Sequence, residues 1–231
     1  NSPYCQYPYV SLYTGRGCPA KCSFCLWPQV TTGHSYRTRS VRNVLDECAK
    51  LKGYFPDMKE LFFDDDTFTA DPKRAVEIAK GLGKLGICWS TNSRANVDRE
   101  TLKAMKDGGL RLFVVGYESG NEQILKNIRK GVSVERARRF TKDCHDIGIL
   151  VHGTFIVGLP GETKDTIEET IRFAQEMQPE TLQVSLASPY PGTHMYDWVV
   201  SNKFLTVDSL VDETGYQKFT ISYPEISADE I

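Results

Sequence analysis

The segment Gly-Cys-Pro-Ala-Lys-Cys-Ser-Phe-Cys, residues 17–25, carries three cysteines directly after a short apolar and aromatic run at 9–14. Thiolates are the usual ligands of iron–sulfur clusters, and a [4Fe–4S] cluster with only three cysteine ligands keeps one iron open. An open coordination position distinguishes a catalytic metal site from a closed structural one. We therefore expect Cys18, Cys22 and Cys25 to hold a [4Fe–4S] cluster whose fourth iron can bind a small molecule.

Outward from this segment, runs rich in β-branched and aromatic residues alternate with helical patterns. The apolar runs have the near-continuous character of parallel strands that are covered on both faces. Between them, Asp71, Asp98, Ser133 and Thr163 are placed to cap helices. Alternating strands and helices form right-handed βαβ units, whose functional residues gather at the carboxyl ends of the strands. We predict an α/β fold, a partial (β/α)6 barrel, with strands at 9–14, 60–65, 87–92, 112–117, 150–157 and 181–187.

Composition excludes several classes of protein. The 231 residues are 40% hydrophobic and 25% charged, with a net charge of −2 and no basic block, which disfavours a nucleic-acid partner. No apolar run approaches the roughly 20 residues of a membrane-spanning helix, and the first residues do not form a signal peptide. The odd number of cysteines, seven, suits a reducing compartment. We expect a cytoplasmic protein.

Other roles for the cysteines stay open at this point. A structural zinc site would need a fourth ligand, such as His34 or Cys5, although zinc ligands usually come as two separated Cys-x2-Cys pairs. A disulfide or chance clustering is a further alternative. The remaining cysteines, Cys48, Cys88 and Cys144, fall on predicted core faces and are expected to act as small buried hydrophobic residues.

Several further motifs, together with the cysteine segment, resemble the radical S-adenosylmethionine (SAM) superfamily from about Tyr9 to Thr193. Those at 63–69 (Phe-Asp-Asp-Asp-Thr-Phe-Thr), 116–120 (Gly-Tyr-Glu-Ser-Gly), 153–163 and 189–193 resemble the branch whose members often carry an N-terminal cobalamin-binding domain. The runs at 22–29 and 36–40 look closest to hopanoid-biosynthesis-associated radical SAM proteins. That resemblance implies a radical SAM core at residues 1–201, the start of a C-terminal extension at 202–231, and a cobalamin-binding domain in the full-length protein.

The resemblance also implies a set of SAM-binding residues at the strand ends. A carboxylate suits the SAM ammonium and the ribose hydroxyls, and a cation suits the SAM carboxylate. Each has a structural alternative: an aspartate that caps a strand end, a surface salt bridge, a solvated lysine. The implied contacts are Phe24 on the adenine, Asp65, Asp66 or Thr67 at the amino group, Glu118 at the ribose, Lys130 at the carboxylate, and the backbone of Ile156, Val157 and Gly158 along the adenine edge.

Function follows from the same resemblance. We expect reductive cleavage of SAM to a 5′-deoxyadenosyl radical, which abstracts hydrogen from a substrate in hopanoid cyclitol-ether head-group biosynthesis, near the membrane surface. Such an enzyme would take a small-molecule or lipid-linked sugar substrate and electrons from flavodoxin or ferredoxin. A cobalamin-dependent radical methyltransferase is the alternative within enzymes; an iron–sulfur electron carrier or a zinc-stabilised binding module is the alternative outside them. Substrate-side candidates are Trp27, His34, Tyr36, Arg37, His152, Tyr190, His194, Tyr196 and Trp198.

Overall fold

The fold is built on one sheet of six parallel strands. The computed structural model describes residues 4–206, 211, 213–215, 220–228 and 230–231. The strands follow one another in chain order across the sheet, so that the first and the last form its two edges and the barrel stays open. The predicted partial (β/α)6 barrel is confirmed. Its strands are β1 (Tyr9–Leu12), β4 (Glu60–Phe63), β5 (Trp89–Ser93), β6 (Leu110–Glu118), β7 (Leu150–Val157) and β8 (Thr181–Leu186).

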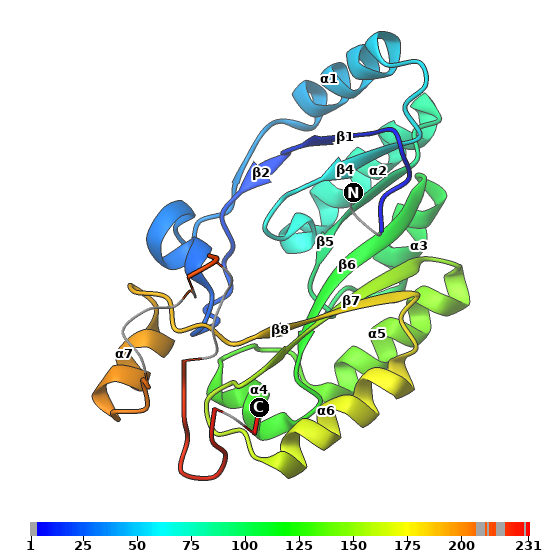
Figure 1. Cartoon of the computed structure of the whole chain (residues 1–231). Helices are drawn as coiled ribbons and strands as arrows, with labels where there is room; N and C mark the ends of the chain where they lie inside the picture. Colours follow the sequence, from blue (N-terminus) through cyan, green and yellow to red (C-terminus); the bar gives the residue numbers. More distant parts are fainter. Residues whose placement is uncertain (1–3, 207–210, 212, 216–219, 229) are drawn as a thin grey trace.

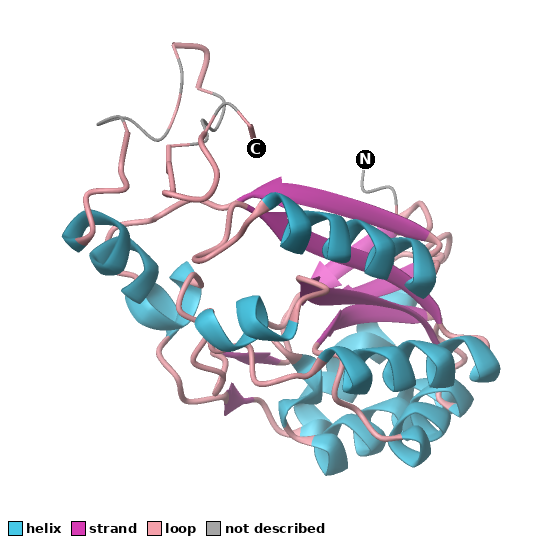
Figure 2. Cartoon of the chain, turned by 90° about the horizontal axis from the view of Figure 1, so that it is seen from below, coloured by secondary structure: helices cyan, strands magenta, loops and turns pink. Residues whose placement is uncertain are grey.

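Helices surround the outer face of this curved sheet (Figures 1 and 2). Successive helices contact one another along the chain, as expected when every crossover has the same hand. Asp71, Asp98, Ser133 and Thr163 each accept a hydrogen bond from a backbone N–H of the first turn, which confirms the four predicted caps. The helices are α1 (Val41–Tyr54), α2 (Pro72–Leu85), α3 (Arg99–Asp107), α5 (Val134–Ile147) and α6 (Lys164–Met177).

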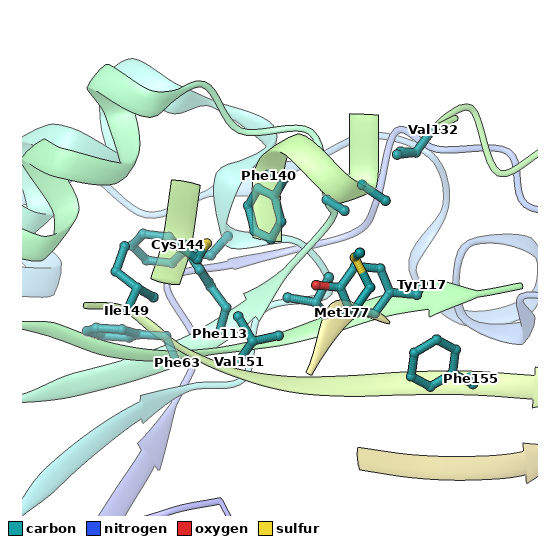
Figure 3. Packing of buried hydrophobic residues seen from close by; sticks show 14 of the residues in the cluster. Phe63, Phe113, Tyr117, Val132, Phe140, Cys144, Ile149, Val151, Phe155 and Met177 are labelled. Atoms are coloured by element: carbon teal, nitrogen blue, oxygen red, sulfur yellow. The ribbon is translucent and has the colours of Figure 1, made fainter. Parts of the chain in front are cut away.

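The core lies between the sheet and these helices. Figure 3 shows Phe113 and Val151 of the sheet packed against Phe140 and Cys144 of α5. Full burial of such side chains contributes about 1.5–3 kcal/mol each. Cys48 and Cys144 are fully buried in this cluster, which confirms their predicted role as hydrophobic residues, and Cys88 is half-buried.

Shorter elements that the sequence patterns did not predict lie beyond the carboxyl ends of the strands (Figure 1). The longest insertion runs between two short antiparallel strands, β2 (Gly15–Arg16) and β3 (Arg37–Thr38), and contains the cysteine segment. We call β2 and β3 the ribbon. The other short elements are the π-helix η1 (Pro28–Thr32), the 3-10 helix η2 (Phe68–Ala70), α4 (Glu122–Asn127) and α7 (His194–Ser201).

The opposite end of the barrel is closed by side chains. Glu60, which is almost fully buried, forms an ion pair with Arg111 at 2.9 Å. The ring of Tyr4 lies 4.5 Å from that of His152, whose Nδ1 is 2.8 Å from Thr181 Oγ1. His152, a substrate-side candidate from the sequence, is thus packed at the start of β7, away from the cysteine segment. In the described part of the chain, no helix is long and apolar enough to cross a membrane.

Candidate active site

The cysteine segment follows β2 and is held by hydrogen bonds to three elements that come later in the chain. Between Cys22 and Cys25, the backbone N–H of Ser23 donates to Ile128 O at 2.9 Å, and its carbonyl accepts from Met195 N at 3.0 Å. The side-chain amide of Gln29 donates to Cys25 O at 2.6 Å. Contacts to α4, α7 and η1 therefore fix the backbone on which the three thiols stand.

The three thiols differ in exposure. Cys22 is buried, and its Sγ accepts from Arg94 Nη1 at 3.5 Å. Cys18 and Cys25 border a cavity of about 600 Å³ that opens at the carboxyl ends of the strands. Burial raises the pKa of Cys25 to about 11 and raises that of Cys18, so metal binding must displace protons from both.

The three thiols and the space beside them are compatible with an iron–sulfur cluster. Cys18 and Cys25 border the 600 Å³ cavity, and Cys22 lies between them in the chain. A [4Fe–4S] cluster places each cysteine on a different iron, and three cysteine ligands leave the fourth iron open.

The acidic segment after β4 contains one buried structural carboxylate, Asp65, and two that line the cavity, Asp64 and Asp66. Asp65 is fully buried and accepts from the backbone N–H and the hydroxyl of Thr14, both at 2.6 Å, and from the Tyr36 hydroxyl at 2.8 Å. Asp66 is exposed, lines the 600 Å³ cavity and accepts from Gly17 N at 2.7 Å. Thr67 is buried. Of the three residues predicted at the SAM amino group, Asp66 is the one that faces the cavity.

Asp65 belongs to a buried polar network that anchors the ribbon. The buried Arg74 donates to the Thr14 carbonyl at 2.8 Å, to the Thr14 hydroxyl at 3.1 Å and to the Tyr36 hydroxyl at 3.4 Å. Burial raises the pKa of Asp65, while the hydrogen bonds from Thr14 and Tyr36 act to lower it. Burial and the charge of Asp65 raise the pKa of Tyr36, so its hydroxyl stays protonated and donates. Tyr36, a substrate-side candidate, therefore lies within this anchor.

Glu118 and Lys130 lie together rather than at separate points of the rim. Their side chains form an ion pair at 2.6 Å and are only 9% and 6% exposed. Glu118 has a positive φ of 68° beside a register shift at the end of β6, and this turns its side chain toward Lys130. A Cβ on Gly116 would meet the Glu118 carboxylate and the Lys130 ammonium, so a larger residue here would require the pair to shift. The predicted contacts of Glu118 and Lys130 with SAM stay predictions. In the structure without SAM, the two charges neutralise each other.

A second, smaller cavity brings together the residues predicted at the adenine. Phe24 and Ile156 line about 210 Å³ of space beside the end of β8, with Tyr190 at the edge. The turn that follows β7 is fixed by Glu162, whose carboxylate accepts from the backbone N–H groups of Gly158 and Leu159. Of the four residues predicted at the adenine, Phe24 and Ile156 line this cavity, and Val157 and Gly158 lead into the turn next to it.

Of the remaining substrate-side candidates, Tyr196 is half-buried on α7 and borders none of the three cavities, and the others are distributed over three places. Trp27 and Arg37 line the 600 Å³ cavity. His34 is exposed, with its Nδ1 2.9 Å from Ala20 O. His194 and Trp198 border a third cavity, of about 290 Å³, on the far side of Ser23.

Two arginines at the site had no role assigned from the sequence. Arg94 follows β5, the kind of position at which functional residues gather, and this signal was available from the sequence. Arg16 lines the 600 Å³ cavity because of the ribbon, which the sequence patterns did not reveal.

An open α/β barrel that presents a three-cysteine loop at the carboxyl ends of its strands is the architecture of a radical SAM domain. Residues 12–174 match the sequence profile of the Radical SAM superfamily, and the chain belongs to this superfamily. Its cofactors are accordingly a [4Fe–4S] cluster and SAM, and it is an enzyme domain.

Curated relatives extend beyond this chain. An uncharacterized methyltransferase of Pyrococcus horikoshii is 36% identical over 201 residues, which are 86% of this chain and 43% of that protein. The cytidylyl-2-hydroxyethylphosphonate methyltransferase of Streptomyces wedmorensis is 29% identical over 96% of this chain and 43% of its own length. The hopanoid C-3 methylase of Methylococcus capsulatus is 27% identical over 86% of this chain and 38% of its own length. The chain thus spans less than half the length of these relatives.

Solved structures support the fold. The radical SAM methyltransferase TsrM of Kitasatospora setae, solved with cobalamin and a [4Fe–4S] cluster, superposes with a TM-score of 0.78 at 19% identity, covering 90% of this chain and 45% of TsrM. The cobalamin-dependent radical SAM enzyme OxsB, solved without ligands, superposes with a TM-score of 0.75 at 19% identity, covering 94% of this chain and 39% of OxsB. At such identities the likeness shows a shared fold.

Proposed function

We propose that this chain is the radical SAM core of a cobalamin-dependent methyltransferase. The observation that carries the proposal is the agreement among relatives: three methyltransferases align over 86%, 96% and 85% of the chain. The resemblance to hopanoid-associated proteins supports the same reaction, because the hopanoid C-3 methylase of Methylococcus capsulatus transfers a methyl group. These relatives favour methyl transfer over the hopanoid head-group chemistry expected from the sequence.

The site offers suitable groups for this work. When bound, the cluster supplies an electron for cleaving SAM, and cobalamin carries the methyl group. Asp66 would bind the SAM ammonium from the cavity wall. Phe24 and Ile156 would hold the adenine in the smaller cavity, where both already line one apolar space. The chain's own task is to position SAM and the acceptor carbon and to keep water away from them.

Further parts of the proposal concern the surroundings of this core. We propose a cytoplasmic protein that receives electrons from a flavodoxin or a ferredoxin and acts on a small molecule. We also keep the division into a core at 1–201 and an extension from 202, together with a cobalamin-binding domain in the full-length protein. Tyr223, from the proposed extension, donates to Gly158 O at 2.9 Å and so packs directly on the turn that follows β7.

A partial reaction tests the proposal without knowledge of the methyl acceptor. The full-length protein, with the proposed cobalamin-binding domain, is reconstituted anaerobically with iron and sulfide, then given cob(I)alamin and SAM with a deuterated methyl group. We expect labelled methylcobalamin and an equal amount of S-adenosylhomocysteine, both measured by mass spectrometry. Under reduction, a radical enzyme of the head-group type would release 5′-deoxyadenosine without forming methylcobalamin. That result would refute methyl transfer and restore the original expectation.

Control variants separate the remaining classes. Cys22→Ala should lose the cluster and any 5′-deoxyadenosine, whereas Cys48→Ala, in the core away from the cysteine loop, should retain both. An iron–sulfur carrier would hold iron and leave SAM intact, and a zinc module would hold stoichiometric zinc without iron. Either outcome contradicts the proposal.

A further inference from the structure

Two arginines face each other across the ribbon at the cavity mouth. In the pairing of β2 with β3, Arg16 lies directly opposite Arg37. Directly opposed residues of an antiparallel pair project to the same face of the sheet, and like charges in such a pair are destabilising. Both side chains line the 600 Å³ cavity that Cys18 and Cys25 also border. The structure therefore maintains an unfavourable pair of cations beside the predicted cluster.

No carboxylate in the described ranges of the chain forms an ion pair with either arginine. Among the described residues, neither guanidinium has an Asp or Glu oxygen within salt-bridge distance, whereas the nearby Arg39 pairs with Glu47 at 2.6 Å. Arg16 instead lies over the ring of Tyr13, with 5.1 Å from its guanidinium carbon to the ring centroid. The two positive charges are thus available to a ligand.

The acidic residues of the same cavity accept hydrogen bonds from other groups and form no ion pair with either arginine. Asp64 accepts from the Tyr13 hydroxyl at 3.1 Å and from the Asn92 side-chain amide at 3.3 Å. Asp66 accepts from the backbone N–H of Gly17 at 2.7 Å. Gly17 adjoins Arg16, and the Arg16 guanidinium lies over the Tyr13 ring, so these hydrogen bonds tie both carboxylates to the segment that carries Arg16. The cavity therefore presents acidic and basic groups close together.

The ribbon that carries the arginines is rigidly placed. Tyr36, next to Arg37 in the chain, is fixed by the buried Asp65, and its ring packs so closely on Gly15 that a Cβ there would lie 2.6 Å away. The backbone N–H of Arg39 donates to Thr14 O at 2.9 Å, which closes the ribbon at its other end. The backbone that carries the two exposed arginines is therefore fixed, so both side chains start from set positions on one face of the ribbon.

We propose that Arg16 and Arg37 form the binding site for a dianionic phosphoryl or phosphonyl group of the methyl-accepting substrate. Two guanidinium groups on one face match the two charges and the several oxygens of such a group, and guanidinium–oxyanion contacts are among the strongest hydrogen bonds. An anion between the arginines removes their mutual repulsion. The assignment to the substrate rests on the proposed function; the anion site itself rests on the ribbon geometry.

Binding of a simple probe tests the site directly. Phenylphosphonate is titrated into the anaerobically reconstituted protein by calorimetry in a phosphate-free buffer, with benzoate and the neutral benzamide for comparison. We expect phenylphosphonate to bind more tightly than benzoate, benzamide not to bind, and the affinity to fall as salt is raised. Arg16→Gln and Arg37→Gln should each weaken binding by about tenfold or more, as for loss of a hydrogen bond to a charged group. Arg172→Gln, an exposed arginine on α6, is the matched control and should bind as the wild type does.

A stability measurement distinguishes a binding role from a structural one. At low salt without ligand, Arg37→Gln should melt at the same temperature as the wild type or higher, because it removes a like-charge repulsion. Phenylphosphonate should raise the melting temperature of the wild type and not that of the variant that combines Arg16→Gln with Arg37→Gln. A lower melting temperature for Arg37→Gln, with unchanged phenylphosphonate binding, would make the arginine structural and overturn the proposal.

Two further outcomes also overturn it. Benzoate binding as tightly as phenylphosphonate would make the site a carboxylate site. An equal loss of SAM affinity in the arginine variants would assign the pair to the SAM carboxylate. If the wild type forms no methylcobalamin while phenylphosphonate binding still depends on both arginines, only the proposed function fails.

Discussion

The effect of the Glu118–Lys130 ion pair on the melting temperature can be predicted quantitatively. The same substitution, Lys→Met, can be made in this buried pair and in an exposed pair. Lys130 donates to Glu118 at 2.6 Å with side chains 6% and 9% exposed. Removing one partner of a buried pair leaves an uncompensated charge and costs about 3–5 kcal/mol. Lys130→Met should therefore lower the melting temperature by about 6–20 °C, at roughly 2–4 °C per kcal/mol for a domain of this size.

The matched control is Lys142→Met. Lys142 pairs with Asp146 at 2.7 Å, almost the same distance, but these side chains are 73% and 40% exposed. An exposed pair of this kind contributes about 0.3–0.5 kcal/mol, so the control should melt within about 2 °C of the wild type. Combining Lys130→Met with Glu118→Gln removes both charges and should recover about 2 kcal/mol of the loss.

Circular dichroism melts and guanidinium unfolding of the four proteins, under reducing conditions, give the measurement. If Lys130→Met is no more destabilised than Lys142→Met, then Glu118 is not left as a buried unpaired charge, and the description of the pair is wrong. SAM affinity of the same variants then reports on the predicted contacts of Glu118 and Lys130. A SAM molecule that engages both residues must exchange their mutual contact for its own.

Three further predictions come from single side chains. Gly116→Ala should destabilise the protein by about 1–3 kcal/mol in chemical unfolding, because its Cβ would meet the buried ion pair at 2.4 Å. Gly53→Ala, in a helix with nothing within 4 Å of the new Cβ, should instead stabilise by about 0.5–1 kcal/mol. Burial raises the pKa of Glu162 to about 7, above its unfolded value of 4.5, so the folded state holds the proton more tightly. The resulting contribution to the free energy of unfolding is complete below pH 4.5 and is lost as the pH rises through 7. Chemical unfolding at a series of pH values should show that the wild type loses on the order of 3 kcal/mol over this range, and that Glu162→Gln does not. Tyr36→Phe should cost about 1–3 kcal/mol in chemical unfolding, because it removes a donor from the buried Asp65, while Tyr54→Phe on the surface should cost nothing measurable.

Most of the regular fold could be predicted because its signals are local. Buried parallel strands appear as continuous apolar runs, and a helix start is marked by its own capping side chain, as at Asp71 and Ser133. The short elements at the strand ends lack such signals. The ribbon has only two residues in each strand, too few for any periodicity, and its partners are separated by the whole cysteine loop.

The site was predicted in its residue types better than in its contacts. Asp64, Asp65 and Asp66 are chemically identical in the sequence, and the buried one, Asp65, is distinguished by its hydrogen bonds to Thr14 and Tyr36, which are distant in the chain. Glu118 and Lys130 were predicted as two separate ligand contacts because their sequence positions say nothing of the backbone turn that joins them. That turn depends on a positive φ at Glu118, a conformation that a sequence pattern does not predict for a glutamate.

The ribbon also explains how one set of anchors can position two parts of the chemistry. The chain leaves β2 at Arg16, passes through the three cysteines and returns at Arg37 in β3, so the two arginines are the two ends of the cluster loop. Asp65 and Arg74 hold those ends through Thr14 and Tyr36. This network therefore fixes both ends of the cysteine loop, while the contacts of Ser23 and Cys25 to α4, α7 and η1 fix its middle. A substrate held by its charged end at the ribbon would then present its more distant carbon atoms to the cluster side of the same cavity.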